Sequence, residues 1–116
     1  MQRFEKLKEN RDFKRLYYRG KSSVAPSFVL YSMKGRSGRI RLGITTGKSI
    51  GNAVQRNRAR RVVTAAFRDL SKNIVPGYDF VVVARTRILK VKSTDVARIM
   101  EGQLKAAGLW YEKTDK

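Results

Sequence analysis

The sequence predicts an α+β fold, with helices packed on a small central β-sheet in the chain order α-β-β-α-β-α. The chain has 116 residues, a length that fits one domain with a modest hydrophobic core. Apolar side chains recur with helical spacing in three segments, and three other segments have the composition, alternation or short apolar run that is typical of strands. Since 41% of the residues are hydrophobic, a disordered basic tail is disfavoured, and we expect residues 1–116 to form a single domain.

One helix and two strands are predicted in the first third of the chain. Residues 10–19 are spaced as a helix, and Gly20 sits where a C-terminal cap belongs. The apolar face of this helix consists of Phe13, Leu16 and Tyr17. Residues 27–33 are β-branched and aromatic, and residues 39–46 alternate between apolar and polar or small side chains, so both predict strands. We expect residues 35–38 to join the two strands as a hairpin.

The next predicted helix begins near Asn52, which with Gln55 three residues later resembles a capping box, with Asn in the Ser/Thr role. Its buried face follows the helical spacing through Ala59, Val62, Val63, Ala66, Phe67 and Leu70. The opposite face carries three arginines within about 80° of one another: Arg58, Arg61 and Arg68. Ala65 lies in the middle of that arc and leaves it uncrowded. Two further arginines lie at the margin between the faces: Arg56 and Arg60.

The last third of the chain predicts a strand and a helix. Residues 80–84 form a nearly continuous apolar run, which is typical of a buried strand. Ser93 can cap a helix that runs to about Ala107 and ends at Gly108. Its expected buried stripe is Val96, Ile99, Met100 and Leu104. The C-terminal tail, about residues 109–116, is expected to be flexible.

The charge distribution predicts a polyanionic partner. The chain has 27 Lys and Arg against 9 Asp and Glu, a net charge of +18. From Phe13 to Arg68 there are fourteen basic residues and no acidic ones. A solvated surface that served solubility alone would mix both signs of charge, so this alternative is disfavoured. Planar guanidinium groups at helical spacing suit the phosphate oxygens of a nucleic acid.

The same composition excludes several chemistries. The absence of Cys and His rules out thiol nucleophiles, His metal sites and His general bases. The nine carboxylates are scattered, whereas Mg²⁺-dependent phosphodiester cleavage by a protein needs them clustered. We therefore expect no catalytic residues and no protein metal site. No apolar run approaches the roughly 18 residues of a membrane span, and the N-terminus lacks the pattern of a secretory signal, so we expect a cytoplasmic protein without a membrane partner.

Aromatic residues indicate a second surface. If the alternate side chains of its strand fill the core, Tyr31 faces the side that carries Arg41 and Gly43. Together with Phe13 and Tyr17, this face suits stacking of single-stranded bases. The alternative is that Phe13 and Tyr17 only dock the first helix on the sheet, and the two roles can coexist.

Residues 48–61, KSIGNAVQRNRARR, closely resemble the K-x-x-G-x-A-V-x-R-N-x-x-[KR]-R run of the bacterial ribonuclease P protein subunit. The resemblance covers most of the chain, because residues 10–20, 28–31, 41–44 and 79–85 are similar to other parts of that family. It implies an α/β sandwich with a left-handed βαβ crossover, although connection rules alone favour a right-handed one.

The resemblance implies a protein subunit that binds ribonuclease P RNA and the 5′ leader of precursor tRNA, and so promotes maturation of the tRNA 5′ end. Catalysis would come from the RNA subunit, which would hold most of the Mg²⁺. The implied contacts to the RNA subunit are Lys48, Asn52, Arg56, Asn57, Arg58, Arg60 and Arg61. The leader cleft would be formed by Phe13, Tyr17 and Tyr31, with Arg41 beside them. Where the family usually has an Arg-Glu pair, this chain has Thr64 and Ala65, and Arg68 is expected to compensate.

A structural RNA-binding protein of the ribosomal type is the alternative function, since it shares the size and charge. Preference for precursor over mature tRNA separates the two, because a structural binder shows none. An autonomous nuclease would need the clustered carboxylates that are missing from the sequence. No obligate protein partner is evident.

Overall fold

The computed structural model describes residues 4–112 and contains the six predicted elements in the predicted order. The helices are α1 (Asn10–Arg19), α2 (Ala53–Leu70) and α3 (Ser93–Ala106). The predicted strands are β3 (Phe28–Lys34), β4 (Ile40–Thr45) and β5 (Tyr78–Ala84). Two short strands, β1 (Phe4–Lys6) and β2 (Lys21–Val24), were not predicted, because they are mostly exposed and have no apolar alternation. The described residues also contain three 3-10 turns: η1 (Lys48–Ile50), η2 (Ser71–Asn73) and η3 (Thr86–Lys90).

The sheet has the order β1-β4-β5-β3-β2, so β5 lies between β3 and β4. The prediction that residues 35–38 form a hairpin is therefore wrong: they connect two strands that each pair with β5. The apolar run of β5 explains this placement, because Phe80, Val81 and Val82 are buried on both faces of the sheet and favour its centre.

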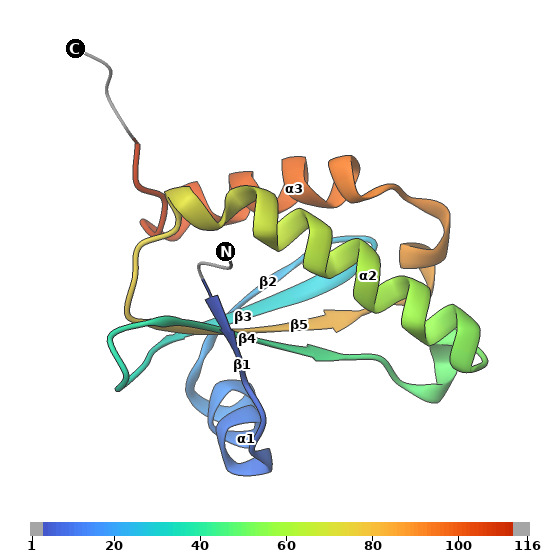
Figure 1. Cartoon of the computed structure of the whole chain (residues 1–116), viewed down its shortest axis with the longest axis horizontal. Coiled ribbons are helices and arrows are strands. Elements are labelled where there is room, and N and C mark those ends of the chain that lie inside the picture. The colour runs from blue at the N-terminus through green and yellow to red at the C-terminus, as the bar shows by residue number, and fades with distance from the viewer. Residues whose placement is uncertain (1–3, 113–116) are drawn as a thin grey trace.

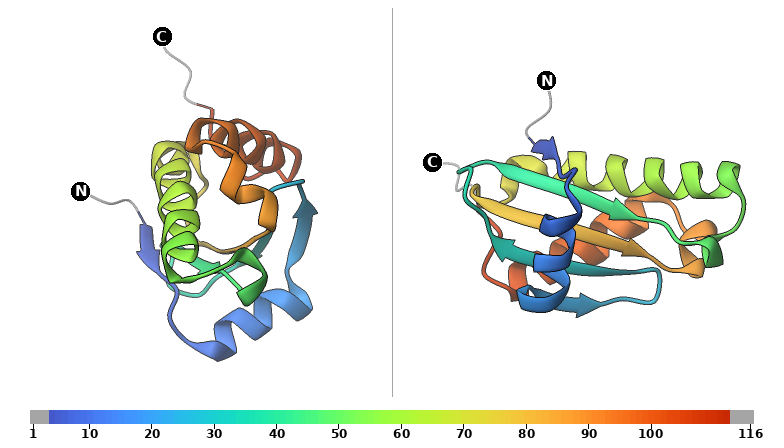
Figure 2. Two further views of the ribbon diagram at one scale, coloured as in Figure 1. Left: turned by 90° about the vertical axis from the view of Figure 1, so that its right-hand side faces the viewer. Right: turned by 90° about the horizontal axis from the view of Figure 1, so that it is seen from below.

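The unit β4–α2–β5 joins two parallel neighbours in the sheet. In the right-hand view of Figure 2, both strands run to the right, β5 lies below β4, and α2 lies behind them. This is a left-handed crossover, as the resemblance implies and against the usual right-handed rule.

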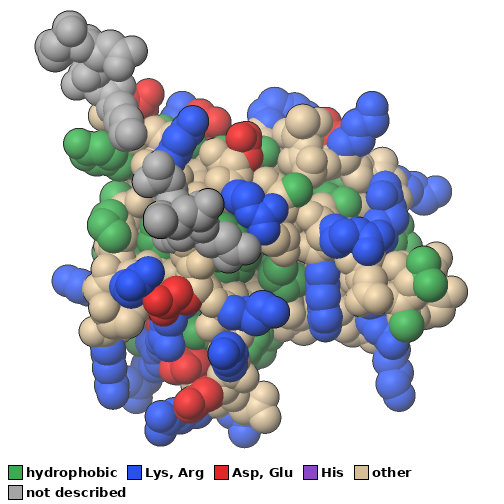
Figure 3. Space-filling model, viewed as in Figure 1, with side chains coloured by type: hydrophobic (Ala, Val, Ile, Leu, Met, Phe, Trp, Pro, Cys, Tyr) green, Lys and Arg blue, Asp and Glu red, His purple; other side chains and the backbone are tan. Residues whose placement is uncertain are grey.

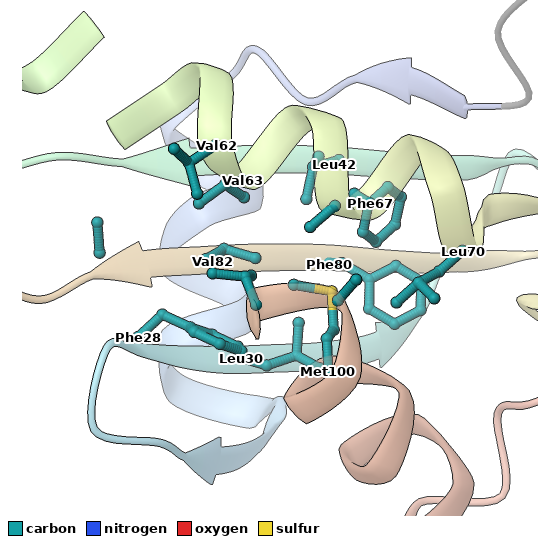
Figure 4. Packing of buried hydrophobic residues seen from close by; sticks show 14 of the residues in the cluster. Phe28, Leu30, Leu42, Val62, Val63, Phe67, Leu70, Phe80, Val82 and Met100 are labelled. Atoms are coloured by element: carbon teal, nitrogen blue, oxygen red, sulfur yellow. The ribbon is translucent and has the colours of Figure 1, made fainter. Parts of the chain in front are cut away.

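The sheet is covered on both faces. Helices α2 and α3 lie side by side on one face and α1 lies on the other, as Figures 1 and 2 show. The larger core fills the space beneath α2 and α3, where Phe28, Phe67 and Phe80 are fully buried (Figure 4). A smaller cluster of Leu7, Leu16 and Val81 lies beneath α1.

The helix ends confirm some predictions and correct others. Ser93 is the first residue of α3 rather than its cap, and the Asp95 carboxylate instead accepts a hydrogen bond from the Lys92 backbone N–H (3.1 Å). Gly108 ends α3 with a positive φ of 75°, as predicted. Gly20 ends α1 with a φ of −72°, so it is not a left-handed cap. A Cβ atom there would lie 2.5 Å from the Leu16 carbonyl oxygen, so the close approach explains the glycine.

The expected flexible tail begins with anchored residues. Leu109 is buried, and the Asn73 side chain donates a hydrogen bond to the Tyr111 carbonyl oxygen (2.9 Å). An isolated bridge also pairs Ile74 with Trp110. Residues 113–116 lie outside the described part of the chain.

Candidate RNA-binding surfaces

The outer face of α2 carries three exposed arginines: Arg58, Arg61 and Arg68, here called the α2 ridge. All six residues predicted for the opposite face are buried, so the amphipathic pattern is confirmed. Within residues 4–112, no carboxylate lies within ion-pair distance of any ridge arginine. In Figure 3, lysine and arginine side chains gather at the right-hand end of the molecule, where α2 begins. The ridge therefore offers uncompensated positive charge to solvent.

The start of α2 is held by its own side chains. The Asn52 side-chain oxygen accepts a hydrogen bond from the Gln55 backbone N–H (2.9 Å), and the Gln55 side chain accepts one from the Asn52 backbone N–H (3.0 Å). This is the predicted capping box. Arg56 donates a hydrogen bond to the Gly51 carbonyl oxygen (2.6 Å), so part of its guanidinium holds the loop. Lys48 is exposed in η1 just before this junction. The side-chain oxygen of Asn52 thus has a structural role, whereas Lys48 remains accessible.

Arg60 is exposed and lies about 100° around α2 from Arg61, outside the ridge. It lines a hollow of about 350 Å³ together with Thr64 of α2, Gly43 of β4 and Phe13 of α1. Asn57 is exposed on the first turns of α2. The predicted RNA contacts therefore lie on two sides of α2, and Arg60 lies between the ridge and the aromatic surface.

The predicted cleft residues meet beneath α1. Tyr31 and Gly43 both pair with Val81 of β5, so the three residues form one row across the sheet. Phe13 lies directly on Gly43, where an added Cβ would come within 2.5 Å of the Phe13 ring. Phe13 therefore docks α1 on the sheet, and Gly43 of β4 leaves the space that its ring occupies.

Tyr17 and Tyr31 form the open part of this surface. Their ring centroids lie 5.2 Å apart with an interplanar angle of 73°, an edge-to-face arrangement. The Tyr17 hydroxyl forms a hydrogen bond with the Thr45 hydroxyl (2.7 Å), which fixes the ring across β4. Tyr17 keeps 38% of its surface exposed. We call the surface of Phe13, Tyr17 and Tyr31 the aromatic cleft.

Arg41 is the predicted cleft residue whose surroundings were not foreseen. Its guanidinium donates two hydrogen bonds to the Asp79 carboxylate, from Nε at 2.9 Å and from Nη2 at 2.7 Å. Arg15 of α1 donates a third at 2.8 Å and also bonds Asp12 at 3.2 Å. Asp79 is fully buried. We call Arg15, Arg41 and Asp79 the clamp, because they tie α1 to the centre of the sheet.

The clamp keeps its charges in the folded protein. Burial by itself would raise the pKa of the Asp79 carboxyl, but hydrogen bonds from Arg41 and Arg15 outweigh burial and hold the pKa below its ordinary value. The sequence contained a signal for this arrangement, since Asp79 is an acidic residue within an apolar strand. A buried carboxylate in such a position requires cationic partners.

No helix within residues 4–112 has the length and apolar character needed to cross a membrane. The same residues contain no group of three or more His, Cys, Asp or Glu placed to hold a metal ion.

Comparison with known proteins supports the fold and shows the family. Residues 1–108 match the family described as Ribonuclease P. The ribonuclease P protein component of Shouchella clausii is 37% identical over 108 residues, which cover 92% of this chain and 88% of the relative. The corresponding protein of Clostridium beijerinckii is 38% identical over 112 residues, covering 90% of each chain.

Solved structures of RNase P proteins share this fold. The RNase P protein of Staphylococcus aureus superposes with a TM-score of 0.78 at 31% identity, covering 90% of this chain and 96% of that structure. The RNase P protein of Thermotoga maritima gives a TM-score of 0.77 at 31% identity, covering 88% and 96%. The extent of these matches shows that the chain belongs to the family of ribonuclease P protein components.

Proposed function

We propose that this protein is the protein subunit of a ribonuclease P ribonucleoprotein and that its α2 ridge binds the RNA subunit. The observation that carries the proposal is the unpaired charge of Arg58, Arg61 and Arg68 on a helix anchored by its buried face. Each guanidinium can donate two parallel hydrogen bonds to a phosphate. Lys48 and Asn57 extend this surface toward the start of α2.

We further propose that the aromatic cleft binds the single-stranded 5′ leader of precursor tRNA. The partly exposed ring of Tyr17 and the neighbouring Tyr31 offer a platform on which bases can stack without sequence preference. Arg60 lies on the hollow between the cleft and α2, where it would contact the phosphates of a strand leaving the cleft. Arg41 would act mainly through the clamp, since Asp79 takes two of its hydrogen bonds.

The proposed division of labour assigns cleavage and most of the Mg²⁺ to the RNA subunit. Carboxylates near the cleft are a poor fit for Mg²⁺, because Arg15 and Arg41 already occupy Asp79 and Arg15 also bonds Asp12. The protein would neutralise phosphates and orient RNA, so its effect would appear as substrate affinity and a lower Mg²⁺ requirement. We place this activity in the cytoplasm, where we expect precursor tRNA to be processed.

Reconstitution tests the proposal. The protein is mixed with a bacterial ribonuclease P RNA at low Mg²⁺, and cleavage of precursor tRNA is measured for substrates with leaders of increasing length. We expect the protein to stimulate cleavage and to favour precursor over mature tRNA in binding. A structural RNA binder would bind both tRNAs equally, and cleavage by the protein without RNA would indicate an autonomous nuclease.

A further inference from the structure

Two arginines of the α2 ridge, Arg58 and Arg61, also line a hollow where α2 passes the start of α3. The hollow has a volume of about 280 Å³ and is lined by Arg58, Arg61, Val62, Ala65, Lys92 and Ser93. We call it the α2–α3 notch. Its cationic residues come from two separate elements, two arginines from α2 and a lysine from the residue before α3.

The shape of the notch follows from small side chains at its centre. Ala65 is exposed but extends only a methyl group, and Val62 beneath it is 8% exposed because it packs into the core. Longer side chains at either position would fill the space. The backbone of Lys92, on the opposite side of the notch, is held in place because its N–H donates a hydrogen bond to the Asp95 carboxylate.

The charge of the notch is not compensated from within. None of its lining residues is acidic. Asp95, the first carboxylate of α3, accepts hydrogen bonds from the Lys92 backbone N–H (3.1 Å) and from Arg98 (3.3 Å). Within residues 4–112, no ion pair involves Arg58, Arg61 or the Lys92 side chain. Positive charge on both sides of the notch favours the binding of a polyanion between them.

We infer that the α2–α3 notch binds the phosphate backbone of the ribonuclease P RNA subunit, with Lys92 and the Ser93 hydroxyl opposite Arg58 and Arg61. This inference rests on the proposed function and deepens it. Contacts from one helix face alone leave the rotation of α2 about its axis undetermined, whereas contacts from two elements fix the orientation of α2 on the RNA. An RNA strand is favoured over a free anion because exposed Arg68 continues the positive charge along α2 beyond the notch.

The first test compares two lysine variants in equilibrium binding to ribonuclease P RNA over a range of salt concentrations. Lys92→Gln removes a notch cation, and Lys72→Gln removes an exposed lysine of η2 at the far end of α2. We expect Lys92→Gln to weaken binding several-fold and to reduce the salt slope by about one unit, the loss of one phosphate contact. Lys72→Gln should leave both quantities near those of the wild type.

The second test locates the RNA strand. Because the chain contains no cysteine, Ser93→Cys gives a single attachment point for an iron chelate that cleaves nearby RNA, and Ser37→Cys in the β3–β4 loop serves as the control. We expect the Ser93→Cys conjugate to cleave one short tract of the RNA subunit that the control conjugate leaves intact. Cleavage of bound precursor tRNA instead would overturn the assignment to the RNA subunit.

The outcomes separate the two proposals. If Arg58→Ala weakens RNA binding while Lys92→Gln matches Lys72→Gln, the notch assignment fails and the proposed function stands. If the wild-type protein shows no affinity for ribonuclease P RNA, both proposals fail.

Discussion

The α2 ridge and the clamp under α1 both consist mainly of arginine, but their charges are in opposite states. Arg58, Arg61 and Arg68 have no carboxylate partner within residues 4–112, whereas Arg15 and Arg41 share the buried Asp79. The ridge can therefore bind an external phosphate without losing an internal contact. In the clamp, the guanidinium groups already donate hydrogen bonds to Asp79, and these bonds hold α1 on the sheet. The difference shows that a count of basic residues does not measure the charge available to a ligand.

The largest effect that tests this comparison should come from Asp79. Asp79→Asn removes the charge but keeps the shape, so Arg15 and Arg41 are left without their counterion. Breaking a buried ion pair from one side should lower the free energy of unfolding by about 3–5 kcal/mol. Urea unfolding in sulfate buffer measures the loss. The control is Glu9→Gln, which breaks an exposed pair with Arg11 and should change stability by less than about 1 kcal/mol.

The pH dependence gives an independent readout of the same variant. Because the folded-state pKa of Asp79 lies below its ordinary value of 3.8, its stabilising contribution is complete above about pH 4 and is lost as pH falls through the folded pKa. We expect the difference in stability between wild type and Asp79→Asn to shrink on acidification. A difference that stays constant down to pH 2 would contradict the ionised clamp.

The next largest effect should be a loss of RNA affinity that distinguishes an arginine without a carboxylate partner from one that has such a partner. Arg61→Ala should weaken binding to ribonuclease P RNA by about 1.5–3 kcal/mol, the range for hydrogen bonds to charged groups, and reduce the salt slope by about one unit. The matched control is Arg39→Ala, because Arg39 is exposed and paired with Glu5 (2.9 Å). Equal losses in the two variants would show that net charge alone decides binding.

The smallest expected effect concerns the cleft. Tyr31→Leu removes the ring but keeps apolar bulk against the cluster beneath α1, whereas Tyr18→Leu changes a residue of α1 that is 85% exposed. We expect Tyr31→Leu to reduce affinity of the holoenzyme for precursor tRNA by about 1–3 kcal/mol and to leave mature tRNA unaffected. Binding of the RNA subunit should be unchanged in both variants. A loss of folding in Tyr31→Leu would assign this ring to the core instead.

Elements with a complete local pattern were predicted correctly. The buried face of α2 matches the helical spacing residue for residue, and its capping box follows from Asn52 and Gln55 alone. The bounds of α1 also agree with the apolar spacing. The short strands β1 and β2 gave no such signal, because three or four mostly exposed residues pair only when a neighbouring strand is already in place.

Contacts between distant segments could not be predicted in the same way. The clamp joins residues 64 positions apart, and its geometry depends on β5 entering the sheet between β3 and β4. The position of β5 between β3 and β4 is also the reason why the predicted hairpin of residues 35–38 is wrong. Likewise, only the structure showed that Arg60 lies on the cleft side of α2 and that Ala65 forms the centre of a notch against Lys92.

The sequence by itself determined that one helix presents a row of arginines, because helix periodicity is a property of adjacent residues. It also determined, through the charge of +18, that the partner is a polyanion. The tertiary structure decided which cations are free to bind it. Whether a guanidinium is neutralised depends on carboxylates brought near by strand order and helix packing, and these distances are set by the whole chain.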